Sequence, residues 1–367
     1  MRILFLNWRD IRHPRHGGAE VYNHEVCRRL VAAGHRVELF TAAFPGALPE
    51  EEIDGVRIVR RGRQWTVHLR AWLRYRRRAR ADFDVVVEEI NTLPFWSPLW
   101  AGIPTVLVIH QLAREVWWYE SRQPLSTVGY LAERYYLRPY RRVPVVTLSR
   151  STSDDLRRLG FRGPVELLPP GVSWPEAWQR PAPAVPTFVY LGRLAPSKRV
   201  HEIIEAFALA RRALPGARLR LIGSGPPGYT ARLAALAERL GVTAGLELSG
   251  RLDEDRKFEA LAGATAIAMA SVREGWGIVV SEAGAVGTPS AVYDVAGLRD
   301  STVDGETGLV VQPRPEALAA AMCRLALEPG LRERLAAGAI AFCRRLSYED
   351  VAAGFQRVLA EAAGDRA

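Results

Sequence analysis

Two glutamates, Glu274 and Glu282, bracket a glycine-flanked tryptophan and three aliphatic residues in the segment SVREGWGIVVSEAGA, residues 271–285. An ionised carboxylate offers two oxygens that accept hydrogen bonds, so it binds vicinal hydroxyls well. Because the two acids lie more than one helical turn apart, they are expected to reach different parts of one ligand. The alternative is that both are solvated surface acids.

A helix is expected to begin near Gly277, because the apolar strand pattern of TAIAMAS ends at Ser271 and a short loop with Glu274 follows. The first amides of a helix have no partner within it, and the helix dipole favours negative charge there. The amides of Gly277 and Ile278 are therefore predicted to donate to phosphate or sugar oxygens.

Two cations follow another predicted strand, in the segment LGRLAPSKR, residues 191–199. Arg193 and Lys198 are separated by a turn that contains a proline. A pair of cations at the end of a strand suits a diphosphate. Basic loops are common, so this motif alone does not identify a diphosphate site and is considered together with the other motifs.

The segment HPRHGGAEVY, residues 13–22, follows the first predicted strand and opens a helix. Gly17 and Gly18 would allow the backbone to approach a ligand closely, although an ordinary tight turn is the alternative. No G-x-G-x-x-G pattern is present, so a dinucleotide fingerprint is absent. His110 ends the predicted strand TVLVIH and is expected at the ligand edge of its sheet; the alternative is a structural histidine.

Strand and helix patterns alternate throughout the chain, which favours an α/β fold with parallel sheets covered by helices. Such doubly wound sheets bind ligands beyond the carboxyl ends of their strands. Buried strands are predicted at residues 2–8, 36–41, 84–90, 105–110, 144–149, 187–193, 218–223, 246–250, 265–271, 289–294 and 308–313. The motifs described above all lie at or after the carboxyl ends of such strands.

The segment PPGVSWPEAWQRPAPAVP, residues 169–186, contains six prolines and no periodic pattern, which indicates an interdomain linker. Two Rossmann-like domains are therefore predicted, at residues 1–170 and 187–345, with the linker at residues 171–186. Their ligand edges are expected to face one another across a cleft.

In combination, these motifs resemble those of the family 4 glycosyltransferases, which have the GT-B fold. The resemblance covers essentially the whole chain. It rests on the Gly-Gly loop with Glu20, on His110, on the Gly-Arg-x5-Lys element of Arg193 and Lys198, and on the E-x7-E element of Glu274 and Glu282. It also extends to the last segment, residues 346–367, which is expected to form a helix that crosses back to the N-terminal domain.

The resemblance implies a role for each motif. Arg193 and Lys198 would hold the diphosphate of a nucleotide-sugar donor, Glu274 the sugar hydroxyls and Glu282 the ribose, while His110 would touch the sugar from the acceptor-binding domain. Further donor contacts are expected from Gly17, Gly18, Gly223, Gly225, Arg251, Leu252, Gly277, Ile278 and Val279. His110, Arg193, Lys198 and Glu274 are the expected catalytic residues.

The implied reaction is retaining transfer of a sugar to a glycan or lipid-linked envelope acceptor, with no metal or other cofactor. A sugar phosphorylase or a nucleotide-sugar epimerase of the same fold is the alternative enzyme. One motif departs from the family, which often has Gly-Gly-x-x-Glu after the following strand. This chain has AGLRD, residues 296–300, with Ala296 and Asp300 at the changed positions.

An arginine-rich segment at residues 60–80 carries nine of the formal net charges, which total +10, and contains no acid. Trp65, Leu69, Trp72 and Leu73 share a face at helical spacing. This pattern suits a helix that lies on an anionic membrane, where charge and aromatic burial add. The expected membrane patch comprises Arg70, Trp72, Arg74, Arg76, Arg77 and Arg78.

The alternative for this segment is a core-packed helix with a solvated arginine face. For the whole protein, the segment also permits a non-catalytic protein that binds anionic lipid. Nucleic acid is not expected, because the other motifs do not favour it. The aromatic stretch REVWWYESR, residues 114–122, is expected to shape the acceptor site.

The composition, with 48% hydrophobic and 25% charged residues, is that of a folded globular protein. No apolar run approaches the length that spans a bilayer or forms a signal-peptide core. Cys27, Cys323 and Cys343 are scattered and lack metal-site spacing, as expected in a reducing cytoplasm. A cytoplasmic protein, peripheral on the inner face of the membrane, is predicted.

Overall fold

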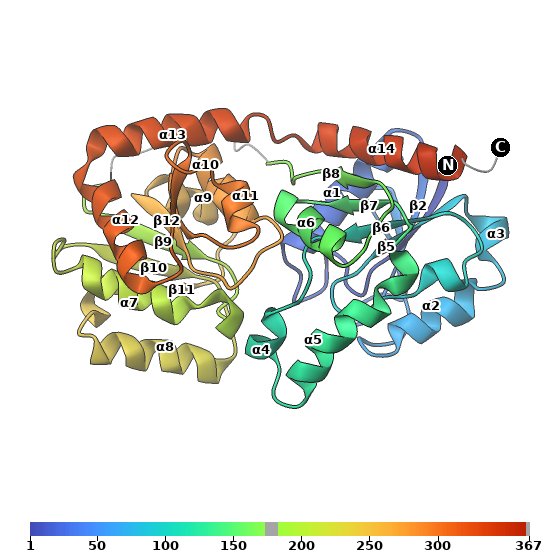
Figure 1. Cartoon of the computed structure of the whole chain (residues 1–367), viewed down its shortest axis with the longest axis horizontal. Helices are drawn as coiled ribbons and strands as arrows, with labels where there is room; N and C mark the ends of the chain where they lie inside the picture. Colours follow the sequence, from blue (N-terminus) through green and yellow to red (C-terminus); the bar gives the residue numbers. More distant parts are fainter. Residues whose placement is uncertain (173–182, 365–367) are drawn as a thin grey trace. The chain divides into compact units, whose positions relative to one another are not determined.

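Two parallel sheets organise the computed structural model, which describes residues 1–172 and 183–364. The chain divides into two units (Figure 1). Unit 1 comprises Met1–Arg114, Thr127–Gly171 and the chain from Ser347 onward, and unit 2 comprises Glu115–Ser126 and Val172–Leu346. The predicted linker at residues 171–186 falls mostly on residues 173–182, which lie outside the described residues.

The sheet of unit 1 has eight strands in the order β3-β4-β2-β1-β5-β6-β7-β8. All neighbours pair in parallel except β3, which pairs with β4 in an antiparallel hairpin that the strand pattern did not predict. The strands are β1 (Arg2–Leu6), β2 (Arg36–Thr41), β3 (Glu50–Ile53), β4 (Val56–Arg60), β5 (Val85–Glu89), β6 (Thr105–Ile109), β7 (Val145–Thr147) and β8 (Val165–Leu167).

Helices cover both faces of this sheet. They are α1 (Gly18–Ala32), α2 (Val67–Tyr75), α3 (Ala79–Asp82), α5 (Leu125–Tyr136), α6 (Arg150–Arg158) and α14 (Tyr348–Gly364), with short 3₁₀ turns η1 (Ser97–Leu99) and η2 (Arg138–Tyr140). Ser149 caps α6, because its side chain accepts from the amide of Thr152 at 3.2 Å.

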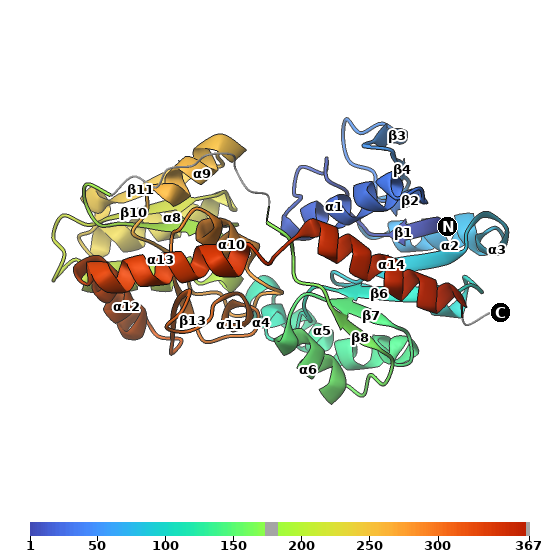
Figure 2. The same ribbon diagram turned by 90° about the horizontal axis from the view of Figure 1, so that it is seen from above.

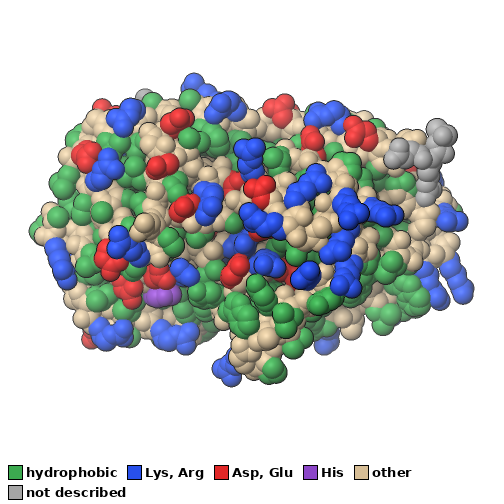
Figure 3. All heavy atoms as spheres, in the orientation of Figure 1, with side chains coloured by type: hydrophobic (Ala, Val, Ile, Leu, Met, Phe, Trp, Pro, Cys, Tyr) green, Lys and Arg blue, Asp and Glu red, His purple; other side chains and the backbone are tan. Residues whose placement is uncertain are grey.

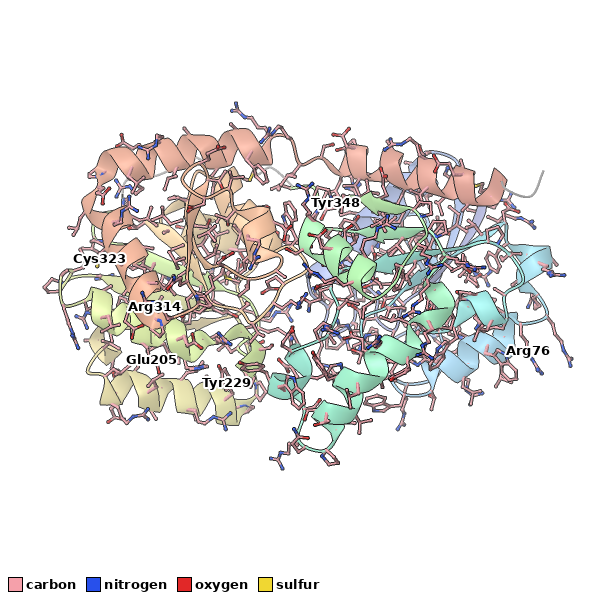
Figure 4. The ribbon with its side chains drawn as sticks, viewed as in Figure 1. Arg76, Glu205, Tyr229, Arg314, Cys323 and Tyr348 are labelled. Carbon is pink, nitrogen blue, oxygen red and sulfur yellow. The ribbon has the colours of Figure 1, made fainter. Side chains whose placement is uncertain are left out.

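The last helix, α14, packs on α1 and on the central strands β5 and β6 of unit 1 (Figures 1 and 2). Tyr348, labelled in Figure 4, begins this helix and lies against Tyr22 of α1 with 6.3 Å between the ring centroids. Tyr22 also donates to the carbonyl of Leu168 at 2.9 Å. The C-terminal segment is thus part of the core of unit 1, although it follows unit 2 in sequence.

The sheet of unit 2 has six parallel strands in the order β11-β10-β9-β12-β13-β14. The inner strands β9, β12 and β13 are apolar and largely buried, as parallel strands covered on both faces require, whereas the edge strand β11 is mostly exposed. The strands are β9 (Thr187–Leu191), β10 (Arg218–Ile222), β11 (Leu246–Gly250), β12 (Ala266–Met269), β13 (Ser290–Tyr293) and β14 (Gly308–Val311). All six correspond to predicted strands.

In unit 2, α7 and α12 pack together, as do α9, α10 and α13, and Figure 1 shows these two groups on opposite faces of the sheet. The helices are α4 (Val116–Glu120), α7 (Val200–Ala210), α8 (Pro227–Arg239), α9 (Glu254–Ala262), α10 (Ile278–Ala285), α11 (Leu298–Ser301), α12 (Pro315–Leu327) and α13 (Pro329–Cys343), with η3 (Pro196–Lys198) and η4 (Thr243–Gly245). Among the described residues, no helix has the length and apolarity needed to cross a membrane.

Candidate active site

The loops after β9 and β10 touch at the carboxyl edge of the unit 2 sheet. Gly223 has a φ of +142°, and a Cβ atom at this position would lie 1.9 Å from the carbonyl oxygen of Gly192. A Cβ atom at Gly225 would lie 2.1 Å from the carbonyl oxygen of Leu194. Both positions therefore require glycine, and the backbone of these loops forms a closely packed surface beside Arg193.

Lys198 and Glu274, which were predicted from separate motifs, meet at this edge. The Lys198 Nζ lies 2.6 Å from the Glu274 Oε1, which also accepts from the Ser271 hydroxyl at 2.6 Å. Both side chains are mostly buried, so the attraction is less screened than at an open surface. Arg193 is exposed, and its side chain has no hydrogen bond or ion pair within residues 1–172 and 183–364.

The segment that departs from the family motif supports Glu274. The amide of Glu274 donates to the carbonyl of Ala296 at 2.9 Å. Gly297 has a φ of +83°, and a Cβ atom there would lie 2.2 Å from the Glu274 carbonyl oxygen. Asp300 accepts from the Gly297 amide at 3.0 Å. Sequence reasoning left this segment out of the site, and the retained glycine was the signal that could have included it.

Gly277 caps the N-terminus of α10 with a φ of +94°, so the helix begins where the sequence predicted. Ile278 and Val279 form its first turn and are half-buried. In the described part of the chain, their amides and that of Gly277 donate no hydrogen bond, as is usual at the start of a helix, and the loop that contains Glu274 leads into them. This arrangement offers hydrogen-bond donors and a positive dipole to an anionic ligand.

Glu282 lies in the middle of α10 and is paired with a residue that sequence reasoning missed. The Nζ of Lys257, on α9, lies 2.9 Å from the Glu282 Oε1 and 2.7 Å from the Glu254 Oε2. Burial raises the pKa of Glu282, and the Lys257 charge opposes that rise. Arg251 and Leu252 lie between β11 and α9; Arg251 is exposed and Leu252 packs partly on the core.

A helix from the N-terminal half of the chain packs in unit 2 beside the lysine turn. Ser197 donates to Glu120 of α4, and Arg199 donates to the Tyr119 hydroxyl at 2.8 Å. Residues 197 and 199 flank Lys198, so both of its neighbours are tied to α4. The predicted role of residues 114–122 was to shape the acceptor site; these contacts place α4 against the turn that contains Lys198.

The same helix forms one wall of a cavity of about 570 Å³. Trp118 and Tyr119 line it, together with Arg273 and Arg299 and the loop residue Ala296. Arg273 contacts Glu115 at 3.2 Å. Because Ala296 and Arg273 adjoin Glu274, the cavity opens next to the Lys198–Glu274 pair.

Gly17, Gly18 and His110 belong to unit 1 and lie at the carboxyl edge of its sheet. Gly17 precedes α1, and its amide donates to the buried Glu20 carboxylate at 2.7 Å. Burial raises the pKa of Glu20, while its ion pair with Arg9 at 2.8 Å acts in the opposite direction. The hydrogen bond from Gly17 to Glu20 therefore holds the backbone of the glycine loop in place.

His110 follows β6 and is buried. Its Nε2 lies 3.3 Å from the Oε1 of Glu89, and its ring meets the edge of Tyr22. The other oxygen of Glu89, Oε2, accepts from the side-chain Nδ2 of Asn7 at 2.7 Å. Asn7 and Glu89 end neighbouring strands, so their place beside His110 follows from the parallel order of the sheet, which the sequence alone did not supply.

The arginine-rich segment forms two short helices, α2 and α3, rather than one continuous patch. Val67, Ala71 and Tyr75 of α2 are buried against the sheet. The opposite side exposes Trp65, Leu69 and Leu73 by 72%, 57% and 48%, with Trp72 beside them. This side is apolar and faces solvent.

The arginines of this segment divide into two groups. Arg60 does not contribute to the charged surface of the segment. Its guanidinium is fully buried and pairs with Asp10 at 2.7 Å. Arg70, Arg76, Arg77 and Arg78 are exposed and Arg74 is half-buried. Arg76, labelled in Figure 4, points outward, and Figure 3 shows Lys and Arg side chains at this end of the visible face.

Two families match the sequence. The family described as "Glycosyltransferase Family 4" matches residues 16–173, and "Glycosyl transferases group 1" matches residues 177–342. A protein named glycogen synthase from Mycobacterium tuberculosis is 27% identical over 92% of this chain and 89% of its own length. A protein named D-inositol 3-phosphate glycosyltransferase from Acidothermus cellulolyticus is 29% identical over 95% of this chain and 87% of its own.

Solved structures share the architecture of the whole chain. Sucrose-phosphate synthase from Thermosynechococcus elongatus superposes with a TM-score of 0.83 at 20% identity, covering 99% of both chains. The Anabaena protein HepE, in complex with UDP and glucose, superposes with a TM-score of 0.76 at 18% identity, covering 98% of this chain and 100% of its own. At these identities, the likeness concerns the fold.

Proposed function

Because this chain belongs to the family 4 glycosyltransferases and has the GT-B fold, we propose that it is a retaining enzyme that transfers a sugar from a nucleotide-diphosphate donor. The observation that carries the proposal is the Lys198–Glu274 pair at 2.6 Å, beside the N-terminus of α10. It combines a cation for a diphosphate with an acceptor for sugar hydroxyls.

The proposed reaction breaks the bond between the anomeric carbon and the diphosphate oxygen. Lys198 and Arg193 stabilise the negative charge that develops on the leaving diphosphate, which is often the largest catalytic contribution. The acceptor hydroxyl attacks from the same face, and its proton passes to the leaving phosphate oxygen. Protein cations thereby supply the charge stabilisation, so we propose that no metal ion is needed.

The remaining predicted residues bind the donor in this proposal. Glu274 accepts from the sugar hydroxyls, and the first amides of α10 donate to sugar or phosphate. Glu282 accepts from the ribose hydroxyls. The backbone at Gly223, Gly225, Arg251 and Leu252 lines the base, while Gly17, Gly18 and His110 contribute from unit 1.

We propose an envelope glycan or lipid-linked acceptor, reached at the inner face of the cytoplasmic membrane. The exposed apolar side of α2 and the arginines around it support this choice, since anionic lipid attracts arginine while Trp and Leu bury in the interface. A soluble glycan is the alternative acceptor, because one relative is named glycogen synthase.

Thermal unfolding in the presence of UDP, GDP, ADP and their common sugars, without added metal, tests the donor. A ligand at about 100 times its Kd stabilises the native state by about 2.7 kcal/mol, which raises the midpoint measurably. UDP-glucose is the first candidate, because HepE binds UDP and glucose and has the same fold.

Replacement of Lys198 by Ala is expected to lower turnover by about a hundredfold or more, the scale of losing one charge-stabilising donor. Initial rates with the donor that shifts the unfolding midpoint measure this effect. Near-normal turnover would refute the role of Lys198. Phosphate-dependent turnover would instead indicate a phosphorylase, and an epimerised free nucleotide sugar an epimerase.

A further inference from the structure

The basic residues of this chain are almost all arginines. Of its 50 Lys and Arg residues, only Lys198 and Lys257 are lysines, which leaves 48 arginines. Each lysine contacts one glutamate of the E-x7-E element, with the Lys198 Nζ 2.6 Å from Glu274 and the Lys257 Nζ 2.9 Å from Glu282. In an arginine-dominated chain, both lysines therefore lie in the proposed donor site.

An ammonium group and a guanidinium group are not interchangeable in such a place. The ammonium is a compact point charge, whereas the guanidinium is a planar fork that suits two oxygens at once. The Lys257 side chain is only 11% exposed and contacts a single oxygen of Glu282. This confined geometry accounts for a lysine in a chain that otherwise uses arginine.

The surroundings of Glu282 make Lys257 its dominant electrostatic partner. Glu254, the second partner of Lys257, is 77% exposed and acts on Glu282 only as a like charge at longer range. Helices α11 and α13 and strand β13 also pack on α10, and within the described residues none contributes a charged side chain to this carboxylate. The Glu282 Oε2 accepts no protein hydrogen bond within that part of the chain.

We propose that Lys257 is a positioning residue for nucleotide binding, which holds the Glu282 carboxylate ionised and in place through Oε1 so that Oε2 is directed to the ribose diol. The inference rests on the proposed function, which puts Glu282 at the ribose. Lys257 itself acts through Glu282 rather than by contact with the reacting atoms.

The physical reason is the cost of burying a carboxylate without a cation. Burial raises the pKa of Glu282, and loss of the Lys257 charge would raise it further. A protonated carboxyl loses the charge-assisted hydrogen bonds that a diol makes with a carboxylate. Binding that needs ionised Glu282 is lost as pH falls through its pKa, so removal of Lys257 moves this loss to higher pH.

The test compares Lys257→Met with the wild-type protein by calorimetric titration at pH 8 and pH 6. The probe is whichever of UDP, GDP and ADP the wild-type protein binds, together with its 2′-deoxy form. Below the raised pKa, the Kd of Lys257→Met is expected to increase by about tenfold for each pH unit, while the wild-type Kd changes less. The variant should also prefer ribose over deoxyribose less than the wild-type protein does.

Two further variants separate positioning from a loss of structure. Glu254→Gln removes the exposed partner of Lys257 and is expected to leave both the Kd and its pH dependence near the wild-type values. In a Glu282→Gln background, Lys257→Met should add no pH dependence, because no carboxylate remains to titrate. Thermal unfolding without nucleotide verifies that each variant is folded.

The inference is overturned if Lys257→Met shows the wild-type pH profile and ribose preference, or if its affinity falls equally at both pH values. A third outcome is that Lys198→Ala loses nucleotide binding while the Kd of Lys257→Met shows no dependence on pH. This outcome would refute the role of Lys257 and leave the proposed function intact. If the wild-type protein binds none of the three nucleotides, the proposed function fails, and the inference fails with it.

Discussion

Single residues in the proposed donor site are paired with one another across large distances in the sequence. Lys198 and Glu274 are 76 residues apart in the chain, yet their charged atoms lie 2.6 Å apart. A bound diphosphate would accept a charge-assisted hydrogen bond from Lys198 in place of Glu274. The Glu274 carboxylate would then be free to accept from the sugar hydroxyls. We therefore expect donor binding to rearrange the pair rather than to fill an empty charged pocket.

Gly297 fixes the backbone of Glu274, and its replacement by Ala is predicted to damage the site. The new Cβ would lie 2.2 Å from the Glu274 carbonyl oxygen, at a φ of +83° that alanine adopts poorly. We expect the free energy of unfolding to fall by at least about 1–2 kcal/mol and turnover to fall by about tenfold or more. Urea unfolding and initial rates measure the two effects.

Gly305→Ala is the matched control for this substitution. Gly305 has a similar φ of +73°, but within the described residues, its two chain neighbours aside, no atom lies within 4 Å of the position of its Cβ. It should therefore lose stability by about 1–2 kcal/mol from backbone strain alone and keep its turnover. Equal turnover of the two variants would contradict a supporting role for Gly297.

At the scale of elements, α4 brings a segment from the N-terminal half of the sequence into unit 2. In the sequence α4 follows β6 and His110, which belong to unit 1, yet it packs in unit 2 beside η3. Its Tyr119 and Glu120 bind the residues on either side of Lys198. A short helix that contributes little to the core therefore helps to hold the proposed diphosphate site.

The double variant Tyr119→Phe with Glu120→Ala is predicted to weaken binding of nucleoside diphosphate by up to about thirtyfold, since two hydrogen bonds of about 1 kcal/mol each would be lost. Binding of the corresponding nucleoside, which has no phosphate for Lys198, should change little. Calorimetric titration of UDP and uridine, or of the matching purine pair, gives the ratio of the two affinities.

Tyr135→Phe serves as the control, because Tyr135 is an exposed tyrosine of α5 in unit 1. It should leave both affinities unchanged. If the nucleoside and the diphosphate weaken equally in the α4 variant, the helix affects unit 2 generally and has no specific connection with Lys198.

At the scale of the whole molecule, the arginine-rich segment of unit 1 determines the expected place of action. Replacement of Arg76, Arg77 and Arg78 by Ala is predicted to abolish most binding to vesicles that contain phosphatidylglycerol, and wild-type binding should weaken with salt. Electrostatic attraction decays over about 10 Å at 0.1 M salt and about 3 Å at 1 M. Co-sedimentation with vesicles measures both.

The control for this prediction replaces Arg239, Arg334 and Arg344, which are exposed on unit 2. The two triple variants have the same net charge, so a general charge effect would weaken both equally. Only the first should lose vesicle binding if α2 and α3 form the docking surface. Equal binding of the wild-type protein to neutral phosphatidylcholine vesicles would rule out the electrostatic contribution.

The sequence by itself determined the class of fold and the loops in which the candidate site lies. Buried parallel strands are continuous apolar runs, so β9 to β14 were recognisable one by one, and ligand edges follow from strand direction. The start of α10 at Gly277 was also local, because the beginning of a helix depends on residues within one helical turn. These features need no knowledge of distant contacts.

The tertiary structure alone decided which of those residues meet. The contacts of Lys257 with Glu282, of Gly297 with Glu274 and of α4 with η3 join segments that are far apart in the chain, and no local pattern encodes them. The burial of Arg60 against Asp10 likewise depends on how a loop folds over a strand. Sequence patterns report what each segment prefers, whereas pairing across segments is set by packing of the complete chain.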